Sequence, residues 1–360
     1  MSIFTYMLTN EYKVIGVMSG TSLDGIDLAY ISFTKNHSWK FKIHNSKTIE
    51  YDEKWRLILA KLTEQTISNI NIIDFEYTKY LSSVINNFIE EFNIKEIDAI
   101  CSHGHTALHQ PKDLITLQIG NLPIISKLLN HLVVCDFRIQ DVIYGGQGAP
   151  LVPIGDHYLF SDYDFCLNLG GFANISTIIE NERIAYDICP VNVILNYYVK
   201  QLGYSYDDGG KIASRGSVNF ELLNELNSLE FYKLSYPKSL GLEWVIKNVI
   251  PLIDNFSLKI ESVLNTIIEH IAIQITNEIN RKINSTILVT GGGTYNTYLM
   301  DRIKNLTNNK IIIPSNEVIE FKEALIFGFL GVLKLRNEVN CLKSVTGASK
   351  DHSTGNIYYP

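Results

Sequence analysis

Three glycine-rich segments hold the residues best suited to bind phosphate. The first, residues 20–25, reads Gly-Thr-Ser-Leu-Asp-Gly and lies between two apolar runs. Its glycines free backbone N–H groups, its hydroxyls are donors, and the Asp24 carboxylate can hold Mg²⁺ through water. The glycine spacing fits neither the Walker nor the Rossmann pattern, so an ordinary hairpin loop explains this segment equally well when it is taken alone.

Two further glycine segments change that balance. Residues 168–176 read Asn-Leu-Gly-Gly-Phe-Ala-Asn-Ile-Ser, and the run Gly291-Gly292-Gly293 follows a short apolar stretch. Glycine lets a nucleotide approach the backbone closely. Tight turns could explain each segment separately, but not their placement at equivalent points of a repeat. Together the three segments predict one nucleotide site.

The elements around these segments occur in a repeated order. In the first half, apolar periodicity predicts strands 14–18, 27–33 and 39–49, helices 54–62 and 75–92, and strand 98–102. In the second half it predicts strands 165–169, 174–179 and 183–188, helices 193–202 and 258–283, and strands 287–290 and 310–313. Strand, glycine turn, strand, strand and helix therefore occur twice.

This order predicts an α/β protein of two similar lobes, with the ligand in the cleft between them. We expect the first lobe to span residues 1–130 and the second lobe to span residues 131–324. A helical pattern at 325–335 is expected to return the C-terminal residues, 325–360, to the first lobe.

Composition narrows the class of protein. The 360 residues are 46% hydrophobic and 19% charged, which is ordinary for a folded globular chain. A net charge of −7 gives no electrostatic footprint for nucleic acid or an anionic membrane, and no secretory leader or membrane-spanning run is evident, so we expect a cytoplasmic protein. The five scattered cysteines suggest neither a disulfide framework nor a thiolate zinc site.

Polar residues at the ends of predicted strands are further candidates. His103 and His105 would share one face of a strand, with His109 nearby, but a zinc site is the less favoured interpretation of this cluster. Asp136, Arg138 and Asp141 follow the buried strand 132–135, where α/β folds commonly meet their ligands, although a surface ion pair is the plainer alternative. Glu323 begins a helix, where its charge can act as a partner of the helix dipole.

The chain resembles the anhydro-N-acetylmuramic acid kinases, and through them the superfamily of actin and sugar-kinase ATPases, whose two-lobed, ribonuclease H-like repeat fold it implies. The matching motifs extend over nearly the whole chain and are too many, in one order, to coincide by chance. They are residues 16–27, 103–106 with 109 and 111, 118–120, 136–138, 141, 145–153, 170–171, 291–293, 323–324 and 346–348.

The resemblance implies a reaction in which ATP, water and 1,6-anhydro-N-acetylmuramic acid give the 6-phosphate of the opened sugar, in peptidoglycan recycling. A base must deprotonate the water that attacks C1, while O6 takes the γ-phosphoryl group. The implied catalytic residues are Asp187 and Asp24, and the implied cofactors are ATP and Mg²⁺, the Mg²⁺ held by Asp24 through water.

The resemblance also implies binding residues. Nucleotide and phosphate contacts are expected from Gly20, Thr21, Ser22, Leu23, Asp24, Gly25, Ile26, Asp27, Gly170, Gly171, Asn174, Gly291, Gly292 and Gly293. Sugar contacts are expected from His103, Thr106, Gln118, Gly120, Asp136, Arg138, Asp141 and Glu323, with Arg138 suited to the lactyl carboxylate. A small sugar is the expected partner, with neither nucleic acid nor membrane, and a homodimer stays open.

One segment departs from the family pattern. Where the family reads Asp-Thr-Gly-Pro-Gly-Asn, this chain reads Asp-Ile-Cys-Pro-Val-Asn at 187–192, and Asn196 stands at a later acidic position. If either lost glycine supplied a positive φ, the loop must differ here. Two alternatives follow: a kinase of another anhydrosugar or amino sugar, or a degenerate sensor that binds nucleotide or sugar without turnover.

Overall fold

The computed structural model describes residues 9–20 and 23–360, which form two compact units. Unit 1 comprises residues up to Leu159 together with Phe321–Pro360, and unit 2 comprises Phe160–Glu320. The C-terminal residues thus return to the first unit. The expected boundary near residue 130 differs from the observed one, because the short strand β6 (Val133–Cys135) pairs with β4 (Ala99–Gln110) and keeps the following segment in unit 1.

Unit 1 is built on a mixed sheet of seven strands. Its strands β1 (Glu11–Ser19), β2 (Gly25–Lys35) and β3 (Trp39–Glu50) form an antiparallel meander, and β1 pairs in parallel with β4. The path runs β12-β6-β4-β1-β2-β3, with β5 (Ile115–Ile119) beside β4 and β12 (Asn356–Tyr358) antiparallel to β6. The meander brings the β1–β2 loop and the end of β4 to the same end of the sheet.

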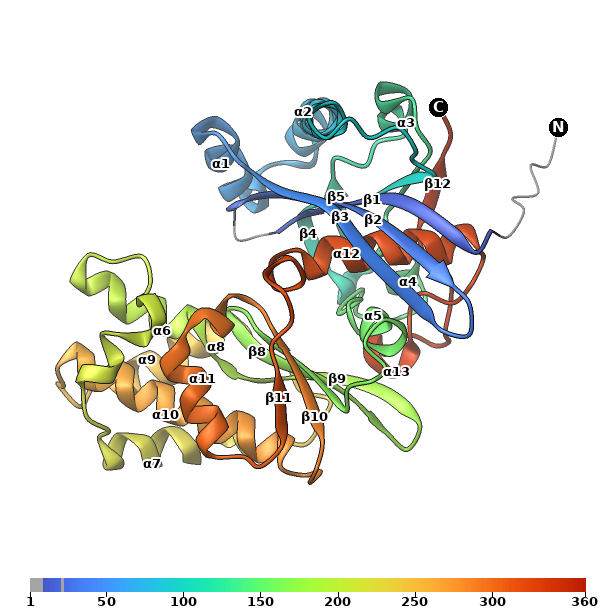
Figure 1. Ribbon diagram of the computed structural model, residues 1–360. Coiled ribbons are helices and arrows are strands. Elements are labelled where there is room, and N and C mark those ends of the chain that lie inside the picture. The colour runs from blue at the N-terminus through green and yellow to red at the C-terminus, as the bar shows by residue number, and fades with distance from the viewer. Residues whose placement is uncertain (1–8, 21–22) are drawn as a thin grey trace. The chain divides into compact units, whose positions relative to one another are not determined.

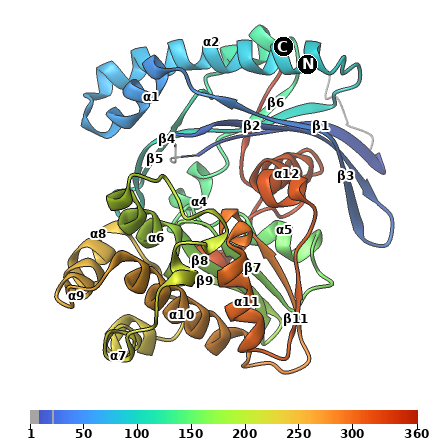
Figure 2. The same cartoon turned by 60° about the vertical axis from the view of Figure 1, so that its left-hand side comes forward.

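Helices cover both faces of this sheet (Figure 1). Figure 2 shows α1 (Glu53–Ala60) and α2 (Ile67–Glu91) on one face and α12 (Asn316–Leu335) on the other. The side chains of Asp52 and Thr66 cap α1 and α2 by accepting backbone N–H bonds, which fixes where each helix begins. Shorter helices connect the strands: α3 (Ile124–Leu129), α4 (Ile139–Ile143), α5 (Pro153–Tyr158) and α13 (Lys343–Thr346).

Unit 2 repeats the central part of that sheet. Strands β7 (Phe165–Leu169), β8 (Phe172–Ile179) and β9 (Glu182–Pro190) form the meander, and β10 (Thr286–Thr290) pairs in parallel with both β7 and β11 (Lys310–Ile312). The order β11-β10-β7-β8-β9 matches β6-β4-β1-β2-β3 strand for strand. The predicted repeat of two α/β units is confirmed.

The helices of unit 2 bury an apolar core against its sheet. The central helix is α10 (Ile260–Ile279), which contacts β9, α6, α7 and α11 and buries nearly every apolar side chain it carries. The remaining helices are α6 (Asn192–Val199), α7 (Phe220–Ser228), α8 (Leu242–Trp244), α9 (Ile250–Asp254) and α11 (Thr297–Asn305). No helix in the described part of the chain is long and apolar enough to cross a membrane.

Candidate active site

The β1–β2 loop begins at Ser19, the last residue of β1, and ends at Gly25, the first of β2. The predicted phosphate donors Thr21 and Ser22 lie outside the described residues. Leu23 takes a positive φ of 62°, and the Asp24 side chain after it is exposed. Gly25 packs against strand β3 so closely that a Cβ would lie 2.5 Å from the Ile49 carbonyl oxygen.

Asp27 lies at the start of β2, opposite Thr48 of β3. The Thr48 hydroxyl donates to Asp27 Oδ1 at 2.6 Å. This bond holds the carboxylate of Asp27 against the sheet and leaves it half-buried.

His103 orients Arg138 within unit 1. Its Nδ1 lies 2.8 Å from the Gly104 carbonyl oxygen, an acceptor, so Nδ1 carries the proton and Nε2 accepts a 2.8 Å bond from Arg138 Nε. Burial, reinforced by the Arg138 charge, holds the pKa of His103 well below its usual range, which keeps the ring neutral. Arg138 also donates through Nη1 to the Gly148 carbonyl at 2.7 Å.

Arg138 remains a cation, and its guanidinium group keeps hydrogen-bond donors for a ligand. Desolvation lowers its pKa to about 10, which is still far above neutral pH. No hydrogen bond from Nη2 to any described residue is present, so that nitrogen can meet an anionic ligand. The charge of Glu323 acts on Arg138 in the opposite direction from desolvation. Glu323 is itself exposed to solvent, although neighbouring protein atoms crowd its carboxyl group and raise its pKa.

His105 belongs to a buried hydrogen-bond network that the sequence did not predict. Its Nδ1 lies 2.9 Å from Ser19 Oγ, which also bonds to the hydroxyls of Tyr51 and Tyr77. Burial lowers the pKa of His105 to about 4 and raises that of Tyr51 to about 12, so the network is uncharged at neutral pH. The network links Ser19, the last residue of β1, to His105 of β4, to Tyr77 of α2 and to Tyr51, the residue after β3.

The prediction that His103 and His105 share one face of their strand is wrong. The register between β1 and β4 shifts after Val17, and Gly104 takes a φ of 73°, which marks a bulge between the two histidines. His103 consequently stacks near Phe327 of α12, with ring centroids 4.6 Å apart, whereas His105 meets the tyrosine rings on the α2 side.

Gln118 lies in β5, and Gly120 follows directly after it. Gln118 pairs with Thr106 across the β4–β5 ladder, and its Oε1 is buried with no hydrogen-bond partner among the described residues. Gly120 takes a φ of 92°, and its N–H donates to Asp74 at 2.7 Å. A buried acceptor without a partner is costly, so Gln118 is suited to accept a bond from a bound ligand.

Asp136 and Asp141 have different surroundings. Asp136, with a φ of 60°, accepts bonds from Asn356 at 3.0 Å and Tyr358 at 3.3 Å, and desolvation raises its pKa. Asp141 is fully buried, and both its oxygens accept hydrogen bonds from within unit 1. Its geometry is that of a group that holds loops together.

In unit 2 the two glycine turns pack against each other. Gly291 takes a φ of 86°, and a Cβ there would lie 2.6 Å from Asn168 Oδ1; a Cβ on Gly293 would lie 2.7 Å from Leu169 Cβ. Gly292 has no heavy atom within 4 Å of its would-be Cβ. The third glycine segment therefore lies directly beside the end of β7, where the Gly170-Gly171 turn begins, and leaves backbone open at its centre.

Asp187 lies on β9 opposite Asn174 of β8. The Leu240 N–H donates to Asp187 Oδ2 at 2.8 Å, and no hydrogen bond to Oδ1 from a described residue is present. Desolvation raises the pKa of this half-buried carboxyl, while the bond from Leu240 counteracts that rise. The backbone donor from residue 240 left no signal in the sequence, because any residue type supplies an N–H.

The departing segment 187–192 closes onto the glycine hairpin through backbone hydrogen bonds. The N–H of Val191 donates to the Gly171 carbonyl at 2.8 Å, and that of Asn192 to Gly170 at 3.3 Å. None of the residues 187–192 takes a positive φ. The substituted residues Cys189 and Val191 are fully buried in the unit 2 core.

Two units with the same strand order, each with glycines between the first two strands of its meander, form the fold of the actin-like and sugar-kinase ATPases. The comparisons narrow the class to a family. A family model described as anhydro-N-acetylmuramic acid kinase matches residues 12–360. The chain belongs to the anhydro-N-acetylmuramic acid kinase family, which confirms the resemblance and the prediction of a kinase.

Individual relatives agree with this assignment. A Sulfurimonas denitrificans protein named anhydro-N-acetylmuramic acid kinase is 35% identical over 364 residues, which cover 96% of this chain and 98% of the relative. A Haemophilus influenzae protein of the same name is 31% identical over 371 residues, covering 96% of this chain and 97% of the relative. The similarity thus spans both units.

Proposed function

We propose that this chain uses ATP to open 1,6-anhydro-N-acetylmuramic acid hydrolytically and to phosphorylate its O6. Family membership over residues 12–360 supports the reaction. The observation that carries it in this chain is Asp187, which keeps an unbonded carboxylate oxygen within a segment that otherwise departs from the family pattern.

Asp187 acts as the general base. The Leu240 N–H fixes Oδ2, which leaves Oδ1 to accept a proton from the attacking water. Partial burial raises the pKa of Asp187 and so makes the carboxylate a stronger base than one in water. The water oxygen bonds to C1, the C1–O6 bond breaks, and O6 takes the γ-phosphoryl group as ADP leaves.

The glycine segments handle the nucleotide. Residues 20–27 and the Gly170-Gly171 turn present backbone donors to phosphate, with Asn174 beside them, and Gly291, Gly292 and Gly293 leave room for close approach. Exposed Asp24 would hold Mg²⁺ through water. When bound, Mg²⁺ neutralises charge on the transferring phosphoryl group.

The sugar contacts come from unit 1. Arg138 offers Nη2 to the lactyl carboxylate, with His103 fixing the guanidinium plane through Nε. Gln118, with Thr106 opposite it and Gly120 beside it, supplies a buried acceptor for a sugar hydroxyl or amide. Asp136 and Glu323 accept from hydroxyls. Asp141 acts indirectly, because its oxygens already accept the N–H of Gly148 and the hydroxyl of Thr346.

An ADP-release assay tests the proposal. Purified protein with ATP, Mg²⁺ and the anhydrosugar is expected to release ADP in step with sugar 6-phosphate, and to release little without sugar. If the protein turned over only a different anhydrosugar or amino sugar, the kinase activity would stand and that sugar would be its substrate. If the protein bound ATP but turned over none of these sugars, the proposal of a kinase would give way to that of a sensor. The substituted segment 187–192 is the sequence feature that favours a sensor.

The location of the protein follows from the same proposal. A kinase that consumes ATP works where ATP is supplied, so we place the protein in the cytoplasm. A small sugar is its partner, and the homodimer named above stays a prediction.

A further inference from the structure

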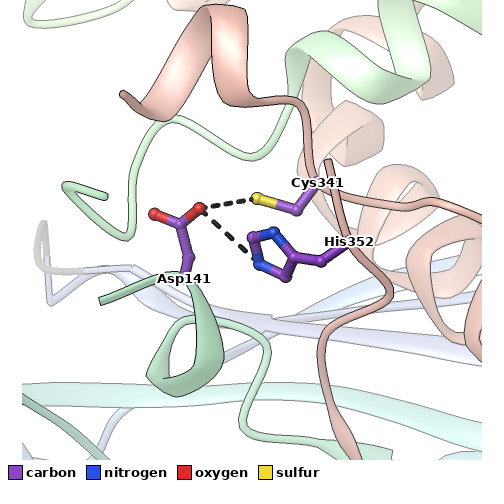
Figure 3. Close-up of side chains that lie close together, drawn as sticks. All are labelled: Asp141, Cys341 and His352. Carbon is purple, nitrogen blue, oxygen red and sulfur yellow. Dashed lines mark hydrogen bonds and ion pairs between the residues drawn. The ribbon is translucent and has the colours of Figure 1, made fainter. Parts of the chain in front are cut away.

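A cluster of three potential metal ligands lies in unit 1, formed by Asp141, Cys341 and His352 (Figure 3). Asp141 belongs to α4, whereas Cys341 and His352 come from the C-terminal segment and face each other across an isolated antiparallel bridge. Two backbone bonds, of 3.1 and 3.2 Å, hold that bridge. All three side chains are buried, with exposed fractions of 0%, 1% and 6% in that order.

Asp141 Oδ1 is the common neighbour of the other two ligands. The Cys341 thiol lies 3.1 Å from it, and His352 Nε2 lies 3.7 Å from it. All three ligand atoms fall within 4.8 Å of one another. Around an ideal tetrahedral zinc, bonds of about 2.0–2.3 Å place neighbouring ligand atoms about 3.3–3.8 Å apart, so both distances to Asp141 Oδ1 already lie near those of a zinc site.

His352 supplies the second observation. Its Nδ1 lies 3.0 Å from the Lys350 carbonyl oxygen, so Nδ1 carries the proton and Nε2 presents a lone pair to the cluster. Nε2 is buried and has no hydrogen-bond partner among the described residues. A lone pair aimed at a carboxylate, at a distance too long for a hydrogen bond, is unfavourable unless a cation lies between them.

From this geometry we infer that Asp141, Cys341 and His352 bind one zinc ion. Thiolate, imidazole and carboxylate are the zinc ligands of proteins, and the Nδ1–H bond to Lys350 is the outer contact that orients a zinc-bound histidine. Binding releases the Cys341 proton to solvent, and the thiolate replaces the hydrogen bond to Asp141 with a bond to zinc. Water or the Thr346 hydroxyl, 2.7 Å from Asp141 Oδ1, fills the fourth position.

The ion has a structural role. Asp141 Oδ2 accepts the Gly148 N–H at 2.7 Å, and the Gly148 carbonyl accepts from Arg138. Zinc would therefore hold the C-terminal segment against the turn that contains Gly148, whose carbonyl accepts a hydrogen bond from Arg138. Because the ligands are buried, the ion enters as the chain folds rather than afterwards.

Metal content is the direct test. The full chain, purified without a His-tag from cells grown with added Zn²⁺, is expected to hold about one zinc per molecule by mass spectrometry of the digested protein. Cys341→Ser keeps a hydroxyl that can donate to Asp141 and is expected to lose at least about nine tenths of the metal. Cys101→Ala, which removes another buried thiol of unit 1, is the matched control and is expected to keep it.

Cobalt provides a readout of the ligands themselves. Chain produced in zinc-depleted medium with Co²⁺ is expected to show a thiolate-to-cobalt charge-transfer band and the intense visible bands of a tetrahedral site, both absent from Cys341→Ser. His352→Gln is expected to lower the metal content as well. Folded wild-type chain that contains neither metal after growth in supplemented medium would overturn the inference, as would a Cys341→Ser variant with undiminished metal.

Discussion

The two units place their carboxylates on different strands of the same framework. In unit 1, Asp27 on the second strand pairs with Thr48 on the third, whereas in unit 2 the second strand carries Asn174 and the third carries Asp187. The positions correspond, because each pair directly follows the first pair of its hairpin, Ile26 with Ser19 and Ala173 with Leu169.

The surroundings separate the two carboxylates. Asp27 Oδ1 accepts the Thr48 hydroxyl at 2.6 Å, whereas in Asp187 the backbone N–H of Leu240 occupies Oδ2 alone. A carboxylate with an unbonded oxygen and a raised pKa is suited to take a proton, and one bonded across its ladder is suited to hold position. In the proposed function, the same framework thus carries the structurally bonded Asp27 in unit 1 and the general base Asp187 in unit 2.

The strongest test of this division is Asp187→Asn. The amide keeps the size and the acceptor for Leu240 but cannot take a proton from water, so turnover should fall by roughly 10²–10⁴-fold while nucleotide affinity changes little. Steady-state ADP release and ATP titration measure the two quantities. Asp27→Asn is the matched control and should cost about tenfold or less. Equal losses in the two variants would contradict the assignment of the base.

Asp24→Asn should act on the metal rather than on the proton. Loss of the exposed carboxylate is expected to raise the Mg²⁺ concentration for half-maximal turnover by about 10–100-fold, because a charge that holds the hydrated ion is gone. Turnover measured across a Mg²⁺ series shows the shift. If the Mg²⁺ dependence were unchanged, the proposal that Asp24 holds Mg²⁺ would be wrong.

Stability should depend on pH through His105, one of the buried histidines of unit 1. The folded pKa of His105 is about 4, below its ordinary value, so as pH falls from 6.5 the unfolded chain binds a proton that the folded chain does not. Stability is therefore full above pH 6.5 and is lost as pH falls toward 4. At pH 5 the contribution of His105 to this loss is about 2 kcal/mol at most.

His105→Gln isolates that contribution. Glutamine does not titrate, so denaturant unfolding at pH 7 and pH 5 should show a smaller loss of stability in this variant than in wild type. Substitution of exposed His37 by glutamine is the control and should leave the wild-type difference in place. If His105→Gln lost as much stability between pH 7 and pH 5 as wild type does, the imidazole beside Ser19 would not be the neutral group described above.

The sequence predicted what depends on local pattern. Both meanders, the Gly170-Gly171 turn and the long helix of unit 2 follow from alternation, glycine and apolar spacing, and the structure contains them. The boundary near residue 130 was misplaced because β6 has only three residues, and its pairing with β4 has no local signature.

Long-range polar contacts escaped prediction for a related reason. The bulge at Gly104 sends His103 and His105 to opposite faces, and an alternating pattern contains no warning of an inserted residue. The Ser19 network draws side chains from β1, α2 and β4 and from Tyr51, which follows β3. Cys341 and His352 meet Asp141 from the far end of the chain. Only the folded chain brings such groups together.

The smallest effect is expected where the family glycines are restored. Cys189→Gly and Val191→Gly should each change turnover by less than about threefold, because no residue in 187–192 takes a positive φ that glycine would relieve. Each should lower the free energy of unfolding by roughly 2–4 kcal/mol, since both side chains are buried in the unit 2 core. Denaturant melts and ADP release on the same samples separate the two effects. A gain in turnover above about tenfold would mean that the substituted segment had cost this chain its activity, and the division of labour between Asp27 and Asp187 would then describe an impaired enzyme.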